Sequence, residues 1–181
     1  FKKEDKAKII EKYKIGDVIP ISITFSEVVT VTGSPQLTLE TGETDAVVNY
    51  TSGSGSTTLL FNYTVSSGQA SNDLDYAGTD ALSLNGGTIL DASGNASVLT
   101  LASPGATNSL GANKALIIDG IVPSVSSVAS STSNGIYKIG ETVAITVTFS
   151  EAVTVNGYPQ LPLETGSSDA VVNYTSGSGS S

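Results

Sequence analysis

The sequence predicts an all-β chain built from antiparallel β-sandwich repeats. Residues 13–56 return at 137–180 with a constant offset of 124, and 32 of 44 positions are identical; a faithful repeat of this kind is typical of a tandem array. After residue 14 the chain is rich in Thr, Ser, Val and Ile, and short segments alternate apolar with polar residues, as half-buried strands do. Clusters of Gly, Pro, Ser and Asn separate these segments and mark turns.

The strands can be assigned in order along the first copy. Residues 18–25 alternate so that four apolar side chains share one face: Ile19, Ile21, Ile23 and Phe25. Pro20 removes a backbone donor, which predicts a sheet edge or a bulge at this point. Further strands are expected at 28–32, 36–40, 45–51, 58–65, 81–84, 97–101 and 114–119. Seven or more short strands with turns between them predict two antiparallel sheets closed over one core.

The repeat divides the chain into three parts. Residues 1–12 are a charged head, 13–120 are a first repeat and 121–181 are a second repeat. Residues 121–136 lead into the second copy, whereas the head occupies that place before the first copy. We therefore expect the first repeat to lack its opening strand and the second to lack its closing strands. The head has room for about three helical turns. Because a short charged helix is marginal alone, a solvated leader or a fusion remnant is the alternative.

Composition favours a structural over a catalytic role. The chain has no His and no Cys, which excludes Ser-His-Asp and Cys-His catalysis, the usual zinc sites and disulfides. Its net charge is −9, although six of the eight lysines lie in residues 1–14. An acidic surface repels nucleic acid and anionic membranes and attracts divalent cations; the alternative is that it only aids solubility. No apolar run of about 18 residues is present, so we expect no membrane insertion.

Several motifs together resemble a known class of repeat. YKIGETVAITVTFSEAVTV, LDYAGTDALSLNGGTILDASGNA and LGANKALIIDG are similar to the tandem immunoglobulin-like repeats of large bacterial cell-surface proteins, of the swimming-associated and adhesin extender types. The resemblance covers residues 13–181. It implies a secreted immunoglobulin-like sandwich at the bacterial cell surface, which holds a distant binding domain away from the cell and has no enzymatic activity. It also implies that calcium stiffens the junctions in some related families.

Four acidic residues are candidates for such a calcium site. Calcium takes six to eight oxygen ligands, largely carboxylates and carbonyls on turns. Asp73 and Asp75 are two residues apart, Asp119 ends the last strand, and Glu151 begins a loop of the next unit. With immunoglobulin-like topology they would meet across the junction; otherwise they are solvated turn residues and strand caps. Residues 91–95 resemble half an EF-hand loop without its Glu, and we interpret them as an Asx turn.

The sequence leaves two functional hypotheses. The first is a structural extracellular repeat, either a rigid spacer of a bacterial surface adhesin or a subunit of a surface filament. Because 13–56 and 137–180 are nearly identical, residues 57–120 can pair with either segment, including one from a neighbouring chain, so copies could join end to end by strand complementation. The alternative is a glycan- or protein-binding module that uses its loops. Aromatic residues clustered in a cleft would favour this second hypothesis.

Overall fold

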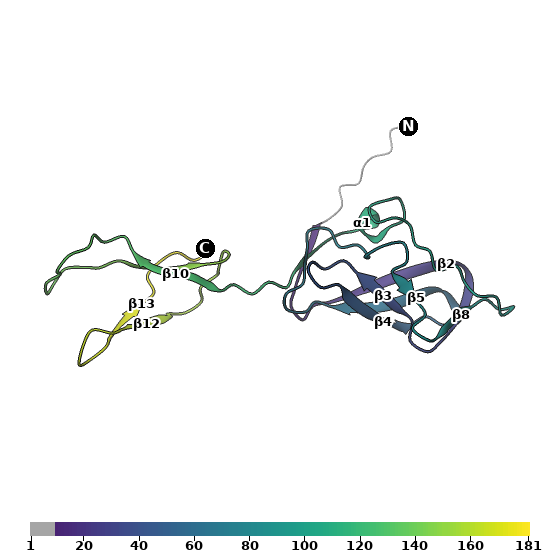
Figure 1. Ribbon diagram of the computed structural model, residues 1–181, viewed down its shortest axis with the longest axis horizontal. Helices are drawn as coiled ribbons and strands as arrows, with labels where there is room; N and C mark the ends of the chain where they lie inside the picture. Colours follow the sequence, from purple (N-terminus) through teal and green to yellow (C-terminus); the bar gives the residue numbers. More distant parts are fainter. Residues whose placement is uncertain (1–9) are drawn as a thin grey trace, which may run out of the picture. The chain divides into compact units, whose positions relative to one another are not determined.

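The computed structural model describes residues 10–181, which separate into two units between Ile121 and Val122. The described chain is all-β with one short helix (Figure 1). Unit one contains β1 (Ile10–Lys14), β2 (Val18–Thr32), β3 (Gln36–Leu39), β4 (Ala46–Ser52), β5 (Ser56–Thr64), β6 (Ala70–Ser71), β7 (Leu82–Ser83), β8 (Thr88–Leu90), α1 (Leu110–Asn113) and β9 (Ala115–Asp119). Unit two contains β10 (Val125–Ser130), β11 (Ile145–Phe149), β12 (Gln160–Leu163) and β13 (Ala170–Asn173).

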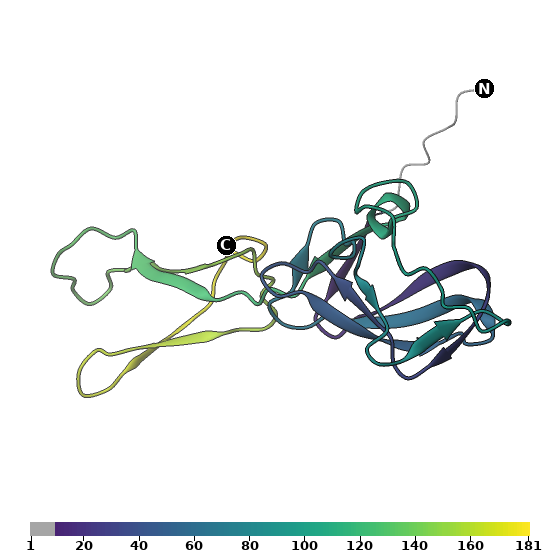
Figure 2. The same ribbon diagram turned by 45° about the vertical axis from the view of Figure 1, so that its right-hand side comes forward.

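The larger sheet of unit one has six strands in the order β7-β3-β4-β5-β2-β8 and curls into a half-barrel (Figure 2). All its neighbouring strands are antiparallel. The long strand β2 pairs with β5 from Val18 to Thr24, and its register shifts before Val29. Beyond the shift, Thr30–Thr32 pairs with β8. The segments expected at 18–25 and 28–32 are therefore two halves of one strand that changes partners at a bulge.

The second sheet, β1-β9-β6, uses part of the charged head. Ile10–Lys14 runs parallel to β9, with Ile10 opposite Ala115 and Lys14 opposite Asp119. The helix considered for the head is thus wrong for residues 10–12, because pairing with a distant strand outweighs a weak local preference. The rest of the head lies outside the described residues. The expected segments 1–12 and 13–120 meet inside β1.

One apolar cluster forms the core of unit one. The alternation read from 18–25 and 58–65 is confirmed on the inward face, where side chains are buried: Ile19, Ile21, Leu59, Phe61, Tyr63 and Val65. Phe61 meets the partly buried Tyr50 edge-on, with ring centroids 6.1 Å apart. Such aromatic contacts add to the stabilisation from burial. The core is therefore centred on the β2–β5 pair.

Further parts of unit one differ from expectation, among them β6 and β8, for which no strand was predicted. The strand predicted at 97–101 is wrong: Leu99 and Leu101 pack against the core, but the Ser97 and Leu101 N–H groups donate to the carbonyls of Ile89 and Thr79 rather than to a strand ladder. The helix α1 was not predicted. Its N-terminus is capped by Ser109, whose hydroxyl accepts the Ala112 N–H at 3.0 Å, as serine commonly does.

Unit two consists of two antiparallel strand pairs, β10 with β11 and β12 with β13. Leu161, opposite Val172 in the second pair, is only half-buried. Every residue of β10 and β13 is exposed. Within its described residues, unit two thus has regular hairpins but no enclosed core.

Candidate functional site

Asp75 has a buried carboxylate held by backbone donors. Its Oδ1 accepts the N–H groups of Tyr76 at 2.9 Å and Leu110 at 3.2 Å, and its Oδ2 accepts the Gly105 N–H at 2.9 Å. A Cβ at Gly111 would lie 2.8 Å from Oδ2, so glycine there gives the carboxylate room. Charged acceptors make stronger hydrogen bonds than neutral ones. Asp75 therefore fixes the loop before α1 and the start of that helix to the body of unit one.

Asp119 pairs with a lysine of the head. Lys12 Nζ lies 2.7 Å from Asp119 Oδ2, and this hydrogen bond is the largest cause that lowers the pKa of Asp119 below its usual value. The Asp119 side chain is 30% exposed, so the pair contributes little to stability. Asp73 is exposed on the loop before Asp75.

Within the described part of unit one, the three aspartates do not by themselves form a cluster that could hold a metal ion. Among the described residues no group of three acidic side chains is arranged to hold a metal ion. Asp75 already accepts three backbone hydrogen bonds, and Asp119 faces the Lys12 ammonium group. A calcium ion, which takes six to eight oxygen ligands, would have to replace these partners. Glu151, in unit two, has a buried Oε1 with no hydrogen-bond partner in the described structure. The shared junction site of Asp73, Asp75, Asp119 and Glu151 stays a prediction.

Residues 91–95 form the Asx turn that was expected from the sequence. Asp91 Oδ1 accepts the N–H groups of Ser93 and Asn95, both at 2.8 Å. The Asn95 side-chain amide donates to Oδ2 at 2.7 Å and is the largest cause that lowers the pKa of Asp91. Gly94 supplies the positive φ of +87° that the turn needs. The Asx turn is confirmed, and its carboxylate is committed to the turn itself.

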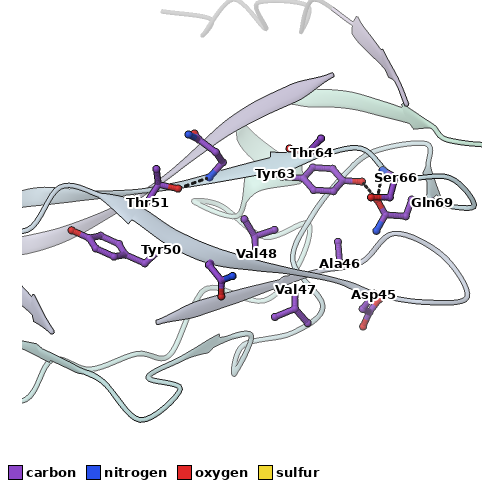
Figure 3. A pocket seen from close by; sticks show the side chains of 12 residues that line it. Asp45, Ala46, Val47, Val48, Tyr50, Thr51, Tyr63, Thr64, Ser66 and Gln69 are labelled. Carbon is purple, nitrogen blue, oxygen red and sulfur yellow. Dashed lines mark hydrogen bonds between the residues drawn. The ribbon is translucent and has the colours of Figure 1, made fainter. Parts of the chain in front are cut away.

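A groove opens between β4 and β5 where the two strands separate (Figure 3). They pair only at Tyr50 and Ser52 of β4, opposite Phe61 and Leu60 of β5. The groove has a volume of about 650 Å³, and its lining is largely polar: Asp45, Asn49, Thr51, Asn62, Thr64, Ser66 and Gln69, with Tyr50 and Tyr63. The groove was not predicted from the sequence, although the outward polar residues of these two strands indicate a polar surface.

Gln69, at one end of this groove, connects Gly120, near the end of unit one, to the core. Its Oε1 accepts the Tyr63 hydroxyl at 2.8 Å and the Ser66 N–H at 2.9 Å. The backbone carbonyl of Gln69 accepts the Gly120 N–H at 2.7 Å. A Cβ at Gly120 would lie 2.3 Å from the Ser66 carbonyl oxygen, so only glycine allows this approach. Burial raises the pKa of Tyr63 to about 12.

Comparisons with protein-family models, with curated proteins and with solved structures find no match to this chain. None of the helices in residues 10–181 is long and apolar enough to cross a membrane. The resemblance to bacterial surface repeats therefore remains a prediction, and the functional argument rests on the internal repeat and on the geometry of unit one.

Proposed function

We propose that the chain is a structural repeat segment of a bacterial cell-surface protein, acting as a rigid spacer or as a subunit of a surface filament. In this proposal the repeats are immunoglobulin-like sandwiches, arranged end to end outside the cell, without catalytic activity. The observation that carries the proposal is that hydrogen bonds hold the last residues of unit one in place. Gly120 donates to the Gln69 backbone carbonyl and accepts the Gly68 N–H at 2.8 Å, so the chain at the end of unit one is held against the core.

The pattern of change between the two copies supports this role. Ile19 is replaced by Val143, Ile23 by Val147 and Ser22 by Thr146, so size and polarity are kept where strands pack. Tandem domains that serve as spacers need a conserved fold more than a conserved site. The absence of His and Cys from the sequence further favours a structural role.

The length of the molecule as a function of repeat number tests the proposal. Chains would carry residues 13–136, one full period, once, twice or three times, followed by residues 137–181. A rigid spacer gives a maximum dimension, measured by small-angle X-ray scattering, that rises by a constant increment with each period. A dimension that grows only as about the square root of the number of periods, as for a flexible chain, would contradict a rigid spacer.

A second candidate is a binding module for neutral glycans, and the β4–β5 groove favours it. Asn49, Asn62 and Gln69 offer amide groups there, and the partly exposed Tyr50 offers an aromatic ring. Amides and aromatic rings are the usual partners of small polar ligands in pockets. Titration of the chain with neutral oligosaccharides tests this candidate, with binding followed by the NMR chemical shifts of backbone amides. Saturable shifts confined to the groove support this candidate, and unchanged spectra exclude it for the sugars tested.

A further inference from the structure

One edge of β2 carries no strand between Val18 and Thr24. In an antiparallel ladder both backbone groups of a residue point to the same edge, and successive residues point to opposite edges. Asp17 accepts the Val65 N–H at 3.0 Å, and the register of β2 with β5 continues without a shift from Val18 to Thr24. The odd-numbered residues therefore bond β5. The even-numbered residues face the other side, here named the free edge of β2: Pro20, Ser22 and Thr24.

No strand of the described part of unit one covers this free edge. β8 lies on the same side of β2 but pairs only with Thr30–Thr32. Pro20 lacks an N–H group, yet because it faces the free edge it removes no bond from the β2–β5 ladder. Its position agrees with the edge expected from the sequence. Unpaired edges of this kind are where additional strands bind.

In unit two the corresponding edge is occupied by β10. β11 repeats residues 21–25, and β10 pairs with it in antiparallel orientation. Here the even-numbered residues make the bonds. The Ser150 N–H donates to the Ser124 carbonyl at 2.8 Å, and the Ala144 N–H donates to Thr132 Oγ1 at 3.0 Å. β10 thus lies on the edge of β11 that β2 leaves free.

We propose that the free edge of β2 binds β10 of a second copy of the chain. The register follows by subtracting the repeat offset of 124 from the register of unit two. It places Ser127 opposite Thr24, Val128 opposite Ile23, Ala129 opposite Ser22 and Ser130 opposite Ile21. This inference rests on the proposed structural role, because it names the contact by which neighbouring copies join.

A cleft beside the free edge provides room for the apolar side chains of the incoming strand. It has a volume of about 430 Å³ and is lined by β2 from Ile23 to Glu27 and by the segment from Asn95 to Leu101. Its apolar walls are only partly buried: Ile23, Phe25, Leu99 and Leu101. An added strand would cover this apolar surface, which is favourable.

Two valines of β10 match the cleft. The register places Val128 next to Ile23 and Val125 next to Phe25. The β10–β11 register shifts between Val125 and Ser127, and such a bulge lets both valines face the same side. In unit two Val125 is 56% and Val128 is 57% exposed. Transfer to β2 therefore buries two apolar side chains that unit two leaves in solvent.

Sheet size and charge also favour the transfer of β10 from β11 to β2 of another copy. In unit two β10 and β11 form a two-stranded sheet, which is marginally stable by itself, whereas β2 belongs to a six-stranded sheet with a core. β10 carries no charge, and neither do Ser22 and Thr24, so the contact itself involves no repulsion between like charges. Donor and acceptor are different segments, so the contact is heterologous and propagates into chains of copies.

Disulfide cross-linking of the full chain tests the contact. The natural sequence has no Cys, so introduced thiols have no competitors. Ser22→Cys chains would be mixed with Ala129→Cys chains, because a hydrogen-bonded antiparallel pair has Cα atoms about 5.5 Å apart, within disulfide range. We expect a cross-linked dimer. The matched control mixes Ser22→Cys with Ser127→Cys, two residues out of register, and should react at least about tenfold more slowly.

The double variant S22C/A129C should give a ladder of oligomers, since each chain then carries both donor and acceptor. Equal cross-linking of the matched and shifted pairs, or a disulfide closed within single chains, would overturn the proposal. Sedimentation gives an independent readout. The mass of the wild-type chain should rise with concentration. Val128→Asp should weaken association by at least about tenfold, and Val47→Asp, at an equally exposed strand valine (56%), should not.

These outcomes separate the contact from the proposed function. A chain that stays monomeric at every concentration, yet lengthens by a constant increment per period, keeps the spacer and overturns the strand exchange. Specific cross-linking in chains that do not lengthen with added periods supports the exchange and contradicts the rigid spacer.

Discussion

Units one and two contain nearly the same hairpin, and its local structure is the same in both. In β3–β4 Gln36 lies opposite Asn49, and in β12–β13 Gln160 lies opposite Asn173. The two Gln–Asn side-chain hydrogen bonds measure 3.0 and 2.9 Å. The turns agree as well, since Gly42 and Gly166 each donate to the glutamate two residues before. Register is thus set locally, by side chains and turn geometry.

The two hairpins differ in burial. Leu37 is fully buried, whereas its copy Leu161 is half-buried. In β4, Ala46 and Val48 are buried and alternate with exposed residues, while β13, which repeats the first four residues of β4, is exposed throughout. Many core residues of unit one come from β5 onward, among them Leu59, Phe61 and Ile118, and the described part of unit two has no counterpart to these. The comparison teaches that residues 13–56 specify hairpins, and that residues 57–120 make them into a core.

The strand before this hairpin differs in its bonding edge. β2 bonds β5 through its odd-numbered residues, and β11 bonds β10 through its even-numbered ones. A complete repeat would use both edges at once, with a strand on either side. Each unit therefore displays one half of the hydrogen bonding that the shared sequence can support.

Leu37 and its copy Leu161 should differ most in their contribution to stability. Leu37→Ala opens a cavity in the core of unit one and should cost about 2–5 kcal/mol of unfolding free energy. Leu161→Ala removes the same side chain from a half-exposed site and should cost less than about 1 kcal/mol. Urea unfolding of the full chain, followed by circular dichroism, measures both. Equal costs would show that unit two has a closed core.

Asp75 distinguishes unit one from unit two, because it lies in the part of the repeat that is present once. Asp75→Asn replaces an acceptor oxygen by a donor that faces a backbone N–H, and should cost about 1.5–3 kcal/mol. Asp73→Asn, at an exposed site, is the control and should be within about 0.5 kcal/mol of the wild type. Thermal unfolding should give the same losses with calcium and with chelator. A loss seen only with calcium would assign Asp75 to a metal site instead.

Tyr63 gives unit one an alkaline signature. Its pKa is raised from 10.0 to about 12 by burial, so the folded state holds the phenolic proton more tightly than the unfolded state. The resulting stabilisation is fully present below pH 10 and is lost as the pH rises through about 12. It amounts to about 3 kcal/mol. In unfolding measured as a function of pH, Tyr63→Phe should abolish this loss of unfolding free energy at alkaline pH. If the variant and the wild type lose the same unfolding free energy between pH 10 and 12, Tyr63 is not its cause.

The smallest expected change in stability comes from Lys12, in the charged head. Lys12 corresponds to Ile136 at the repeat offset, so Lys12→Ile makes the first copy like the second. It should raise the pKa of Asp119, measured by NMR titration of its carboxyl group. Because the pKa of Asp119 is lowered in the folded state, the pair stabilises above the ordinary pKa near 3.9 and fades as the pH falls through the folded value. The cost at neutral pH is about 0–1 kcal/mol. An unchanged Asp119 pKa would show that Lys12 is not its partner in solution.

Sequence patterns predicted what depends on near neighbours. The alternation of 58–65 and the Asp91 turn were predicted because residues a few positions apart determine them. The partner of Ile10–Lys14 is β9, about a hundred residues later, and no local pattern reveals that pairing. The role of Asp75 depends on backbone N–H groups at Gly105 and Leu110, which any residue except proline supplies. In the sequence such an acceptor resembles a metal ligand, and its hydrogen bonds to distant backbone N–H groups become visible only in the fold.

Amide hydrogen exchange, measured by NMR at low protein concentration, tests the central claim that the two copies bond through opposite edges. In β2 the amides of Ile21 and Ile23 should be protected, and those of Ser22 and Thr24 should exchange freely. In β11 the order reverses, with Thr146 and Thr148 protected and Ile145 and Val147 exchanging. Protection of Ser22 and Thr24 equal to that of Ile21 and Ile23 in the monomer would contradict the account.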